Sequence, residues 1–333
     1  MRVLVTGGAG FIGSHLVDRL ILDGYDVRVL DDFSTGTEFN LGEALASGKL
    51  EIVRGSVLNH QTINRAMDGV QAVFHLAVEC VRRSLGDPIT NHAVNATGTL
   101  YTLEAARRHA VDRFVYCSSS EVYGNTSNSP LNEKTTVCSP VTVYGAAKLA
   151  GELYSLAYWQ TYKLPVVVVR PFNSYGPREH HQGDIAEVIP RFFIRVMNGV
   201  PPIVFGDGAQ GRDFTYVEDT ARGISAALCS DAIIGRVLNL GTGRLVTIRE
   251  LAYRVMECCG RDGLGVKYLG RRPGDVYRLT ADTNCARELL NFAPRTELRE
   301  GLKKYLQWFD KHYPDPGLLL EDEPENWNMP GVS

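Results

Sequence analysis

Two side chains four residues apart, Tyr144 and Lys148, have the types and spacing needed to oxidise an alcohol. Residues at this spacing share one face of a helix, so the Lys148 ammonium can hold positive charge near the Tyr144 phenol. A free phenol titrates at about pH 10, so a tyrosine that acts as a base at neutral pH needs about 4 kcal/mol of phenolate stabilisation. We expect Lys148 and a cofactor cation to lower the pKa of Tyr144, which takes the hydroxyl proton while hydride leaves carbon. Ser119 is expected to hydrogen-bond the same oxygen.

A tyrosine and a lysine with this spacing also occur on ordinary amphipathic helices, and the N-terminus favours the chemical interpretation. Residues 2–6 are typical of a strand and run directly into Gly7-Gly-Ala-Gly10-Phe-Ile-Gly13, which is followed by an apolar segment with helical periodicity. Glycines at these positions allow a tight turn and a close approach of a pyrophosphate to the N-terminus of the helix. The strand, turn and helix together predict a dinucleotide site.

A carboxylate follows the second predicted strand. Asp31 lies 18 residues beyond Gly13, near the spacing at which an acid accepts hydrogen bonds from the adenosine ribose. A carboxylate there would repel a 2′-phosphate, so the sequence favours NAD over NADP. The alternative interpretation of Asp31 is a solvated strand end.

Composition narrows the class of protein. The chain has 333 residues, 44% of them hydrophobic, and a net charge of −3, so it can bury a large core. The charge balance indicates neither a nucleic-acid groove nor an anionic membrane partner, and we expect a cytoplasmic protein because we find no spanning segment or signal peptide. The seven cysteines and eight histidines show no metal-ligand spacing. We expect reduced thiols, mostly in the core, and no metal site.

Strand and helix patterns alternate through the first half of the chain, and the apolar run 164–170 is typical of a strand covered on both faces. The pattern predicts an α/β fold with a doubly wound parallel sheet. We expect a Rossmann NAD-binding domain over residues 1–172, with a return segment near 213–245. The remainder is expected to form a smaller, mixed substrate lobe, mainly 173–313, and a peripheral tail over 314–333.

Taken together, the glycine turn, Ser119 and Tyr144-x-x-x-Lys148 resemble the extended short-chain dehydrogenase/reductase family, and more narrowly its nucleotide-sugar epimerases and dehydratases. The similarity extends from about Arg2 to about Trp308. Further matches in the same order are His75-Leu-Ala77, Asn95-x-x-Gly98-Thr99, Ser118-Ser-Ser-Glu-Val-Tyr-Gly124, Arg170-Pro-Phe-Asn-Ser-Tyr-Gly-Pro177, Gly206-Asp-Gly-x-x-x-Arg212-Asp-Phe-Thr-Tyr-Val-x-Asp219 and Arg272-Pro-Gly-Asp275.

The resemblance implies NAD as cofactor, a nucleoside-diphosphate sugar as substrate and a homodimer formed through the helices near 95–109 and 144–162. Its catalytic residues would be Ser119, Glu121, Tyr144 and Lys148. Its cofactor site would comprise Gly7, Gly10, Phe11, Ile12, Gly13, Asp31, Asp32, Ser34, Gly36, Ser56, Val57, Leu76, Ala77, Asn95, Tyr144, Lys148 and Pro171. Its substrate site would comprise Glu79, Arg82, Ser120, Asn173, Val188, Arg191, Arg212, Arg271 and Asp275.

Two of these positions carry open questions. The family often has an acid after the glycine of the third strand, where it meets the adenine amino group, whereas here Gly55 is followed by Ser56, a weaker acceptor. The guanidinium of Arg212 suits a diphosphate, and the alternative is a salt bridge between the two domains.

The residues after Ser119 bear on the reaction. A transient ketone at C4 of the sugar acidifies the C5 hydrogen, so a base can remove it and water can leave from C6. If hydride instead returns to the other face of the ketone, the product is the C4 epimer, and a C6 carboxylate could be lost as CO₂ because the ketone makes it a β-keto acid. The resembling dehydratases and decarboxylases carry a glutamate near C5 at the position of Glu121, which favours chemistry at C5 and C6. The dTDP-glucose dehydratases, however, have an aspartic acid where this chain has Ser120. The alternatives are a simple 4-epimerase, in which Glu121 only bonds a backbone amide, and, more remotely, a non-enzymatic NAD-binding sensor.

The loop after Ala77 is unusually charged, with Glu79, Arg82 and Arg83. Either arginine can meet a substrate carboxylate, which would suit a glucuronate. The default expectation is that both are solvated at the edge of the lobe.

Overall fold

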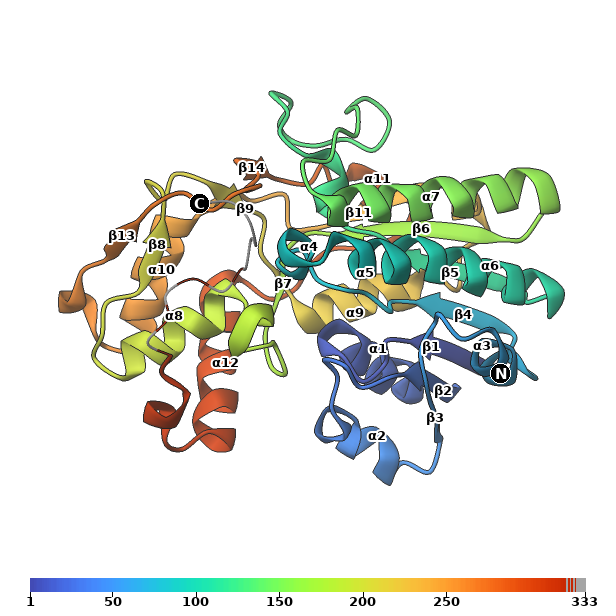
Figure 1. The fold of residues 1–333 in the computed structure, drawn as a ribbon, viewed down its shortest axis with the longest axis horizontal. Coiled ribbons are helices and arrows are strands. Elements are labelled where there is room, and N and C mark those ends of the chain that lie inside the picture. The colour runs from blue at the N-terminus through green and yellow to red at the C-terminus, as the bar shows by residue number, and fades with distance from the viewer. Residues whose placement is uncertain (322, 324, 326, 328–333) are drawn as a thin grey trace.

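The computed structural model describes residues 1–321, 323, 325 and 327, and its largest unit is a parallel sheet of seven strands in the order β11-β6-β5-β4-β1-β2-β3 (Figure 1). The order reverses between β1 and β4, as in a doubly wound sheet, and the predicted fold class is confirmed. The strands are β1 Arg2–Thr6, β2 Asp26–Asp31, β3 Leu50–Arg54, β4 Ala72–His75, β5 Arg113–Cys117, β6 Val166–Pro171 and β11 Val237–Leu240.

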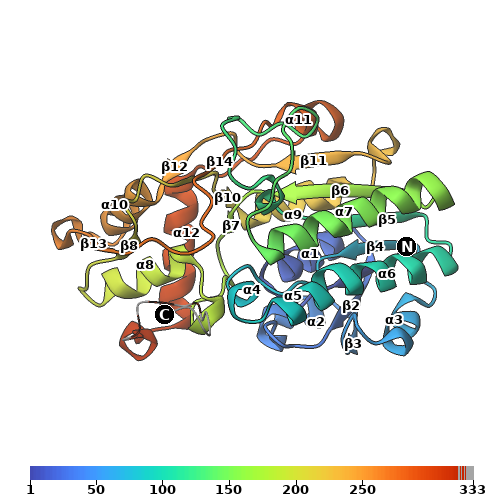
Figure 2. The same ribbon diagram turned by 45° about the horizontal axis from the view of Figure 1, so that its top comes forward.

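The sheet is parallel because helices cover both of its faces. In β6, Val167 and Val169 pack into one apolar cluster and Val166 and Val168 into the other, so the continuous valine run serves two cores. Helices α1 and α9 contribute to the first cluster, and α3 and α6 to the second, which faces the viewer in Figure 2. β11 comes from the region where a return segment was predicted and pairs with β6.

The α-helices range in length from 4 residues in α4 to 20 residues in α7. Their bounds are α1 Phe11–Leu22, α2 Gly42–Ala46, α3 His60–Met67, α4 Arg83–Gly86, α5 Pro88–His92, α6 Gly98–Arg108, α7 Val143–Tyr162, α8 Val188–Met197, α9 Val217–Ala226, α10 Ile248–Cys258, α11 Asn284–Leu290 and α12 Leu298–His312. Within the described residues, none is long and apolar enough to cross a membrane.

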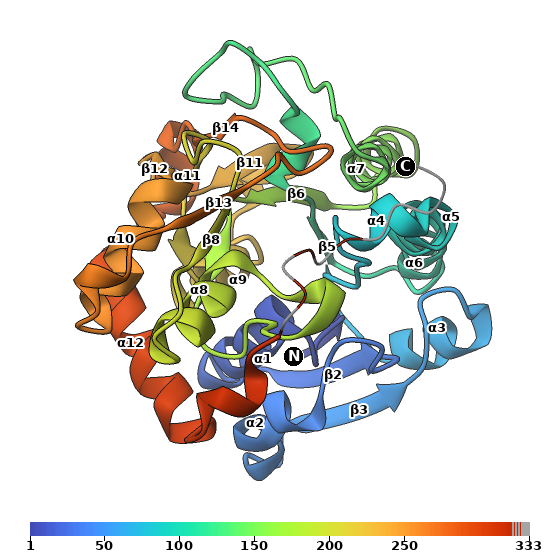
Figure 3. The same cartoon turned by 60° about the vertical axis from the view of Figure 1, so that its left-hand side comes forward.

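A smaller lobe lies beside the sheet and has its own core, formed by α8, α10 and α12 (Figure 3). Short strands join its parts in three small sheets: β10 with β7, β13 with β8, and β9 between β12 and β14. Their bounds are β7 Ser174–Tyr175, β8 Ile203–Phe205, β9 Gly211–Arg212, β10 Thr215–Tyr216, β12 Val246–Thr247, β13 Lys267–Leu269 and β14 Arg278–Leu279.

Candidate active site

The glycine turn between β1 and α1 tolerates no larger residue at two positions. Gly7 has φ +69°, and a Cβ there would lie 2.7 Å from the backbone nitrogen of Ala77, in the loop after β4. A Cβ on Gly13 would overlap the carbonyl oxygen of Gly7. The turn therefore lies directly against the neighbouring loop at the point where strand order reverses, which leaves the N-terminus of α1 open to a phosphate.

Asp31, at the end of β2, fixes the geometry around this turn. Its carboxylate accepts hydrogen bonds from the backbone nitrogens of Ala9 at 2.9 Å and of Phe33 at 2.8 Å. Burial raises the pKa of Asp31, although the two amides oppose this effect. Asp31 is therefore not a solvated strand end, and its role toward the ribose stays a prediction.

A cavity of about 290 Å³ runs from this turn to α7. It collects all but two of the residues predicted for the cofactor: Gly7, Gly10, Phe11, Ile12, Gly13, Asp31, Asp32, Ser34, Ser56, Val57, Leu76, Ala77, Tyr144, Lys148 and Pro171. We call it the cofactor cavity. Ser56 lies in its wall, while its hydroxyl oxygen accepts a hydrogen bond from the backbone of Leu58 at 3.2 Å.

The two exceptions, Gly36 and Asn95, support the wall rather than form it. A Cβ on Gly36 would meet the backbone of Ala9 at 2.7 Å, so Gly36 keeps its loop against the glycine turn. Asn95 is fully buried in the π-helical turn Ala93–Thr97, and its amide bonds the backbone nitrogen and oxygen of Glu79 at 3.0 and 2.9 Å. These bonds shape the loop after β4, and the contact of Asn95 with the cofactor stays a prediction.

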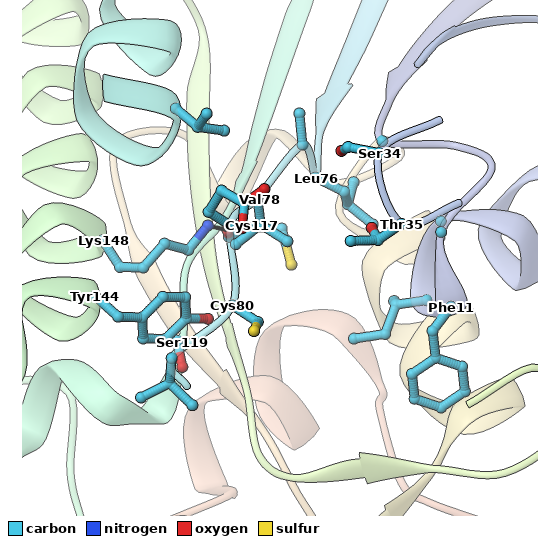
Figure 4. Close-up of a pocket in the computed structure, with 18 of the residues that line it drawn as sticks. Phe11, Ser34, Thr35, Leu76, Val78, Cys80, Cys117, Ser119, Tyr144 and Lys148 are labelled. Atoms are coloured by element: carbon cyan, nitrogen blue, oxygen red, sulfur yellow. Dashed lines mark hydrogen bonds between the residues drawn. The ribbon is translucent and has the colours of Figure 1, made fainter. Parts of the chain in front are cut away.

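The predicted reaction centre is assembled at the start of α7. The Thr142 hydroxyl caps this helix by accepting from the backbone nitrogen of Gly145 at 3.1 Å, which starts the turn that carries Tyr144. Tyr144 and Lys148 both project into the cofactor cavity, with Ser119 beside the tyrosine (Figure 4). Cys80 lies close by and was not predicted, because its position depends on the loop after β4.

The predicted lowering of the Tyr144 pKa by Lys148 and a cofactor cation stays a prediction, and burial acts against the charged form of both side chains. Its ammonium donates to the Cys117 carbonyl at 2.6 Å, and burial lowers the pKa of Lys148 to about 8. Burial also raises the pKa of Tyr144, against a hydrogen bond with Ser119 that lowers it. Burial is the largest influence on the Tyr144 hydroxyl, so its phenolate needs further positive charge.

A buried ion pair behind this centre escaped sequence reasoning. Arg170 bonds the carboxylate of Glu152 at 2.8 and 2.6 Å, and both side chains are at most 5% exposed. The Ser118 hydroxyl donates to the same carboxylate. The only available sequence signal was an acid one turn after Lys148, and its partner is 18 residues away. Because Arg170 belongs to β6 and Glu152 to α7, the pair holds this strand and this helix together next to Ser118.

A second cavity of about 150 Å³ adjoins the first and is lined largely by the smaller lobe. We call it the lobe cavity. Of the predicted substrate residues it contains Arg82, Asn173, Val188, Arg191, Arg212 and Asp275, whereas Glu79 and Ser120 line the cofactor cavity together with Asn173. The side-chain oxygen of Asn173 is buried without a hydrogen-bond partner in the described chain. It is therefore available to a ligand.

Arg271, which was predicted for the substrate site, lies apart from its neighbour Arg272. Its side chain is 77% exposed and lies 3.8 Å from Asp207, outside both cavities. Arg272 lines the lobe cavity instead and bonds Asp275 at 2.7 Å. Arg212 bonds the same Asp275 oxygen at 2.7 Å, so its ion pair stays within the lobe and does not bridge to the sheet. Sequence cannot distinguish neighbours in a loop whose direction depends on its packing.

The default expectation of solvated loop arginines is wrong for Arg82, which is 6% exposed. Arg82 bonds both carboxylate oxygens of Glu187, at 2.9 and 3.2 Å. Arg83 is half-buried and bonds Asp184 at 3.0 Å and Glu79 at 3.3 Å. The loop before α8 supplies the counter-charges, and only the fold brings it here.

Glu121 lines both cavities. Its backbone nitrogen donates to the Ser119 hydroxyl at 3.2 Å, which orients the start of the short 3₁₀ turn after β5. Its carboxylate makes no hydrogen bond within the described part of the chain, which contradicts the alternative of a bond to a backbone amide. Burial raises the pKa of Glu121, while Arg212 and Arg272 act to lower it.

The tail is less peripheral than predicted. Residues 319 and 320 pack against the core of the smaller lobe, and Glu321 accepts from the backbone nitrogen of Gly183 at 2.7 Å. Trp327 lines the lobe cavity and meets Phe205 edge-on with ring centres 4.8 Å apart. Residues 322, 324, 326 and 328–333 of the predicted tail lie outside the described residues.

With this geometry in view, comparison with known proteins decides the family. A model of the NAD-dependent epimerase/dehydratase family matches residues 3–241. The chain belongs to this family. It is 36% identical to a dTDP-glucose 4,6-dehydratase of Streptomyces niveus, over 93% of each chain.

Two solved structures show the same relationship. A UDP-glucose 4-epimerase of Thermotoga maritima, determined with UDP-glucose, is 34% identical with a TM-score of 0.88, covering 94% of this chain and 99% of that one. A dTDP-glucose 4,6-dehydratase of Streptomyces venezuelae, determined with NAD, is 31% identical with a TM-score of 0.89, covering 96% and 100%. The resemblance drawn from the sequence is confirmed, and with it an enzyme of an NAD-dependent family.

The residues present fit NAD. The glycine turn packs against protein backbone with no room for a Cβ on Gly7 or Gly13, and its residues border the cavity at the start of α1, where a pyrophosphate would bind. Asp31 lines the same cavity, where it would face an adenosine ribose. At the other end, Tyr144, Lys148 and Pro171 line the same cavity. One continuous space therefore joins a phosphate cradle to a proton-transfer centre.

Proposed function

We propose that this enzyme oxidises C4 of a nucleoside-diphosphate hexose transiently and then uses Glu121 for proton transfer at C5. The observation that carries this proposal is the position of Glu121, whose side chain lines both the cofactor cavity and the lobe cavity. A sugar extending from the lobe cavity to Tyr144 would pass it. Loss of water from C6 follows from a C4 ketone once the C5 proton is removed, whereas a 4-keto hexuronate is a β-keto acid that loses CO₂ directly and is then protonated at C5.

The lobe cavity supports a nucleoside diphosphate. Five arginines line it, and burial lowers the pKa of two of them, Arg191 and Arg195, which shows that water solvates these cations poorly. Guanidinium groups match the geometry of phosphate oxygens. Aromatic side chains of Phe192, Phe205 and Trp327 share the cavity and provide ring surfaces for a base.

The protein's part in the oxidation is to move one proton. NAD, when bound, would accept the hydride from C4, and its positively charged pyridinium ring would stabilise the buried Tyr144 phenolate. Tyr144 removes the proton of the C4 hydroxyl, and Ser119 holds the same oxygen. Lys148 keeps an ammonium in the cavity wall.

Glu121 then acts on the ketone. Burial raises the pKa of its carboxyl group, which suits a group that takes up and returns a proton near neutral pH. Arg212 and Arg272 stabilise the charged form. We infer that Glu121 removes the C5 proton that the C4 ketone acidifies.

A simple 4-epimerase is the second candidate, and Ser120 favours it. Loss of water from C6 calls for an acid beside the C6 hydroxyl, and this chain places a buried serine next to Glu121. Inversion at C4 needs Tyr144 but no second acid.

The test is incubation with UDP-, GDP- and dTDP-hexoses in deuterated water, with products analysed by mass and NMR. Dehydration predicts loss of water and deuterium at C5 from the wild type, and C4 oxidation without C5 exchange from Glu121→Gln. An unchanged mass with inverted C4, from both proteins and without deuterium at C5, would assign the 4-epimerase.

We further propose a homodimer formed through α6 and α7. Leu153 and Tyr162 of α7 are 59% and 53% exposed, which leaves apolar surface on this helix that a second copy of the chain would cover. Light scattering should give twice the chain mass, and Leu153→Glu should halve it.

A further inference from the structure

The two cavities meet at four residues of the described chain, Val81, Glu121, Asn173 and Glu187, which line both. We call this set the junction. Under the proposed function, the hexose lies here, with C4 toward Tyr144 and C5 and C6 toward Glu121. Two of the four side chains are carboxylates and none is a cation, so the junction is acidic at the position of C6.

The nearest arginine of the loop after β4 uses four of its five N–H donors within the protein. Arg82 Nε bonds the Asp184 carbonyl at 2.9 Å, and one terminal nitrogen bonds the Ile185 carbonyl at 2.5 Å. This nitrogen also bonds the Glu187 carboxylate at 2.9 Å, and the other terminal nitrogen bonds the second oxygen of that carboxylate at 3.2 Å. All three guanidinium nitrogens therefore serve the loop before α8.

Glu187 stays charged in this arrangement. Burial acts to raise the pKa of its carboxyl group, but the charge and hydrogen bonds of Arg82 outweigh it, so the pKa is lowered. Because Arg82 anchors this carboxylate, Glu187 cannot turn away from the cavities without breaking a buried ion pair.

Three further arginines near the junction are paired with carboxylates. Arg83 bonds Glu79 and Asp184, while Arg212 and Arg272 share one oxygen of Asp275. A carboxylate on C6 would therefore meet two carboxylates at the junction, where none of the four lining residues is a cation.

We propose that the Arg82–Glu187 pair selects a neutral hexose and rejects a hexuronate. The inference rests on the proposed function and narrows it, because a substrate without a C6 carboxylate can lose water but not CO₂. Like charges brought together at a binding site cost enough to change affinity by about tenfold or more.

The experiment compares matched sugars that differ only at C6. Dissociation constants of glucose and glucuronate nucleotides, carried on UDP and on dTDP, are measured by calorimetry with NAD-loaded wild-type protein. The wild type should bind the glucose nucleotide about tenfold or more tightly than its glucuronate partner. Equal affinity, or release of CO₂ from a glucuronate, would overturn the proposal.

Two variants locate the selectivity. Glu187→Gln removes one charge and loosens Arg82, so the preference should fall to less than about threefold, half of the tenfold effect on a logarithmic scale. Asp184→Asn is the matched control, because this exposed carboxylate of the same loop lines neither cavity, and it should keep the full preference. An unchanged preference in Glu187→Gln, with affinity for free UDP or dTDP retained, would remove Glu187 from the explanation.

Failure of the proposed function has a different signature. If neither sugar nucleotide binds, or if both bind without any C4 oxidation, the assignment of the reaction is wrong. If both bind equally and C4 is oxidised, the reaction stands and only the selectivity is lost.

Discussion

Lys148 provides a prediction in which catalysis and stability oppose each other. Its side chain is 3% exposed, and burial lowers its pKa from 10.5 to about 8. The difference, about 2.5 pH units, corresponds to about 3 kcal/mol of unfolding free energy that the protein loses by holding this ammonium in the cavity wall at neutral pH. Lys148→Met removes the charge and keeps most of the side-chain volume.

The sign follows from where each state releases the proton. Below about pH 8 the folded and unfolded chains both carry it, and the full cost is present. Between about pH 8 and 10.5 the unfolded chain still holds the proton that the folded chain has released, so stability rises with pH. Above pH 10.5 the cost is gone.

Urea unfolding without added NAD measures the effect. The wild type should gain about 2 kcal/mol relative to Lys148→Met between pH 7 and about pH 9.5, because all other titrations cancel in the comparison. Lys311→Met, which removes an exposed lysine of α12, is the matched control and should show no such change. A difference between wild type and Lys148→Met that is constant over this range would refute the desolvation argument.

Three further perturbations test separate parts of the site. Tyr144→Phe should lower turnover by orders of magnitude while NAD still binds, measured by steady-state kinetics and NAD titration; near-normal activity would reject the proton-transfer role. Gly13→Ala places a methyl group against the backbone carbonyl of Gly7 and should weaken NAD binding by about tenfold or more in the same titration. Unchanged NAD affinity would show that the turn accommodates the methyl group. Glu152→Gln leaves the Arg170 guanidinium buried without its counter-charge and should lower the unfolding free energy by about 3 kcal/mol, whereas a loss below about 1 kcal/mol would show that solvent reaches the pair.

Features formed by residues that are close together in the sequence could be predicted best. The glycine turn, the strand that precedes it and the Tyr144 helix were all expected, and the structure places them at one cavity. Asn95 was expected in the site, but its contact with the Glu79 backbone depends on how the loop after β4 folds back. Trp327 carried no signal, because nothing in the sequence shows that the tail reaches the lobe cavity.

By itself, the sequence predicted the α/β fold, the cofactor class and a pair of residues for proton transfer, because these depend on periodicity and on residues a few positions apart. Only the tertiary structure decided that Arg82 is committed to Glu187, 105 residues away, and that Arg272 rather than Arg271 lines the lobe cavity. It also decided that burial raises the pKa of Tyr144. Desolvation and ion pairing depend on which distant segments exclude water from a group, and no local pattern records that.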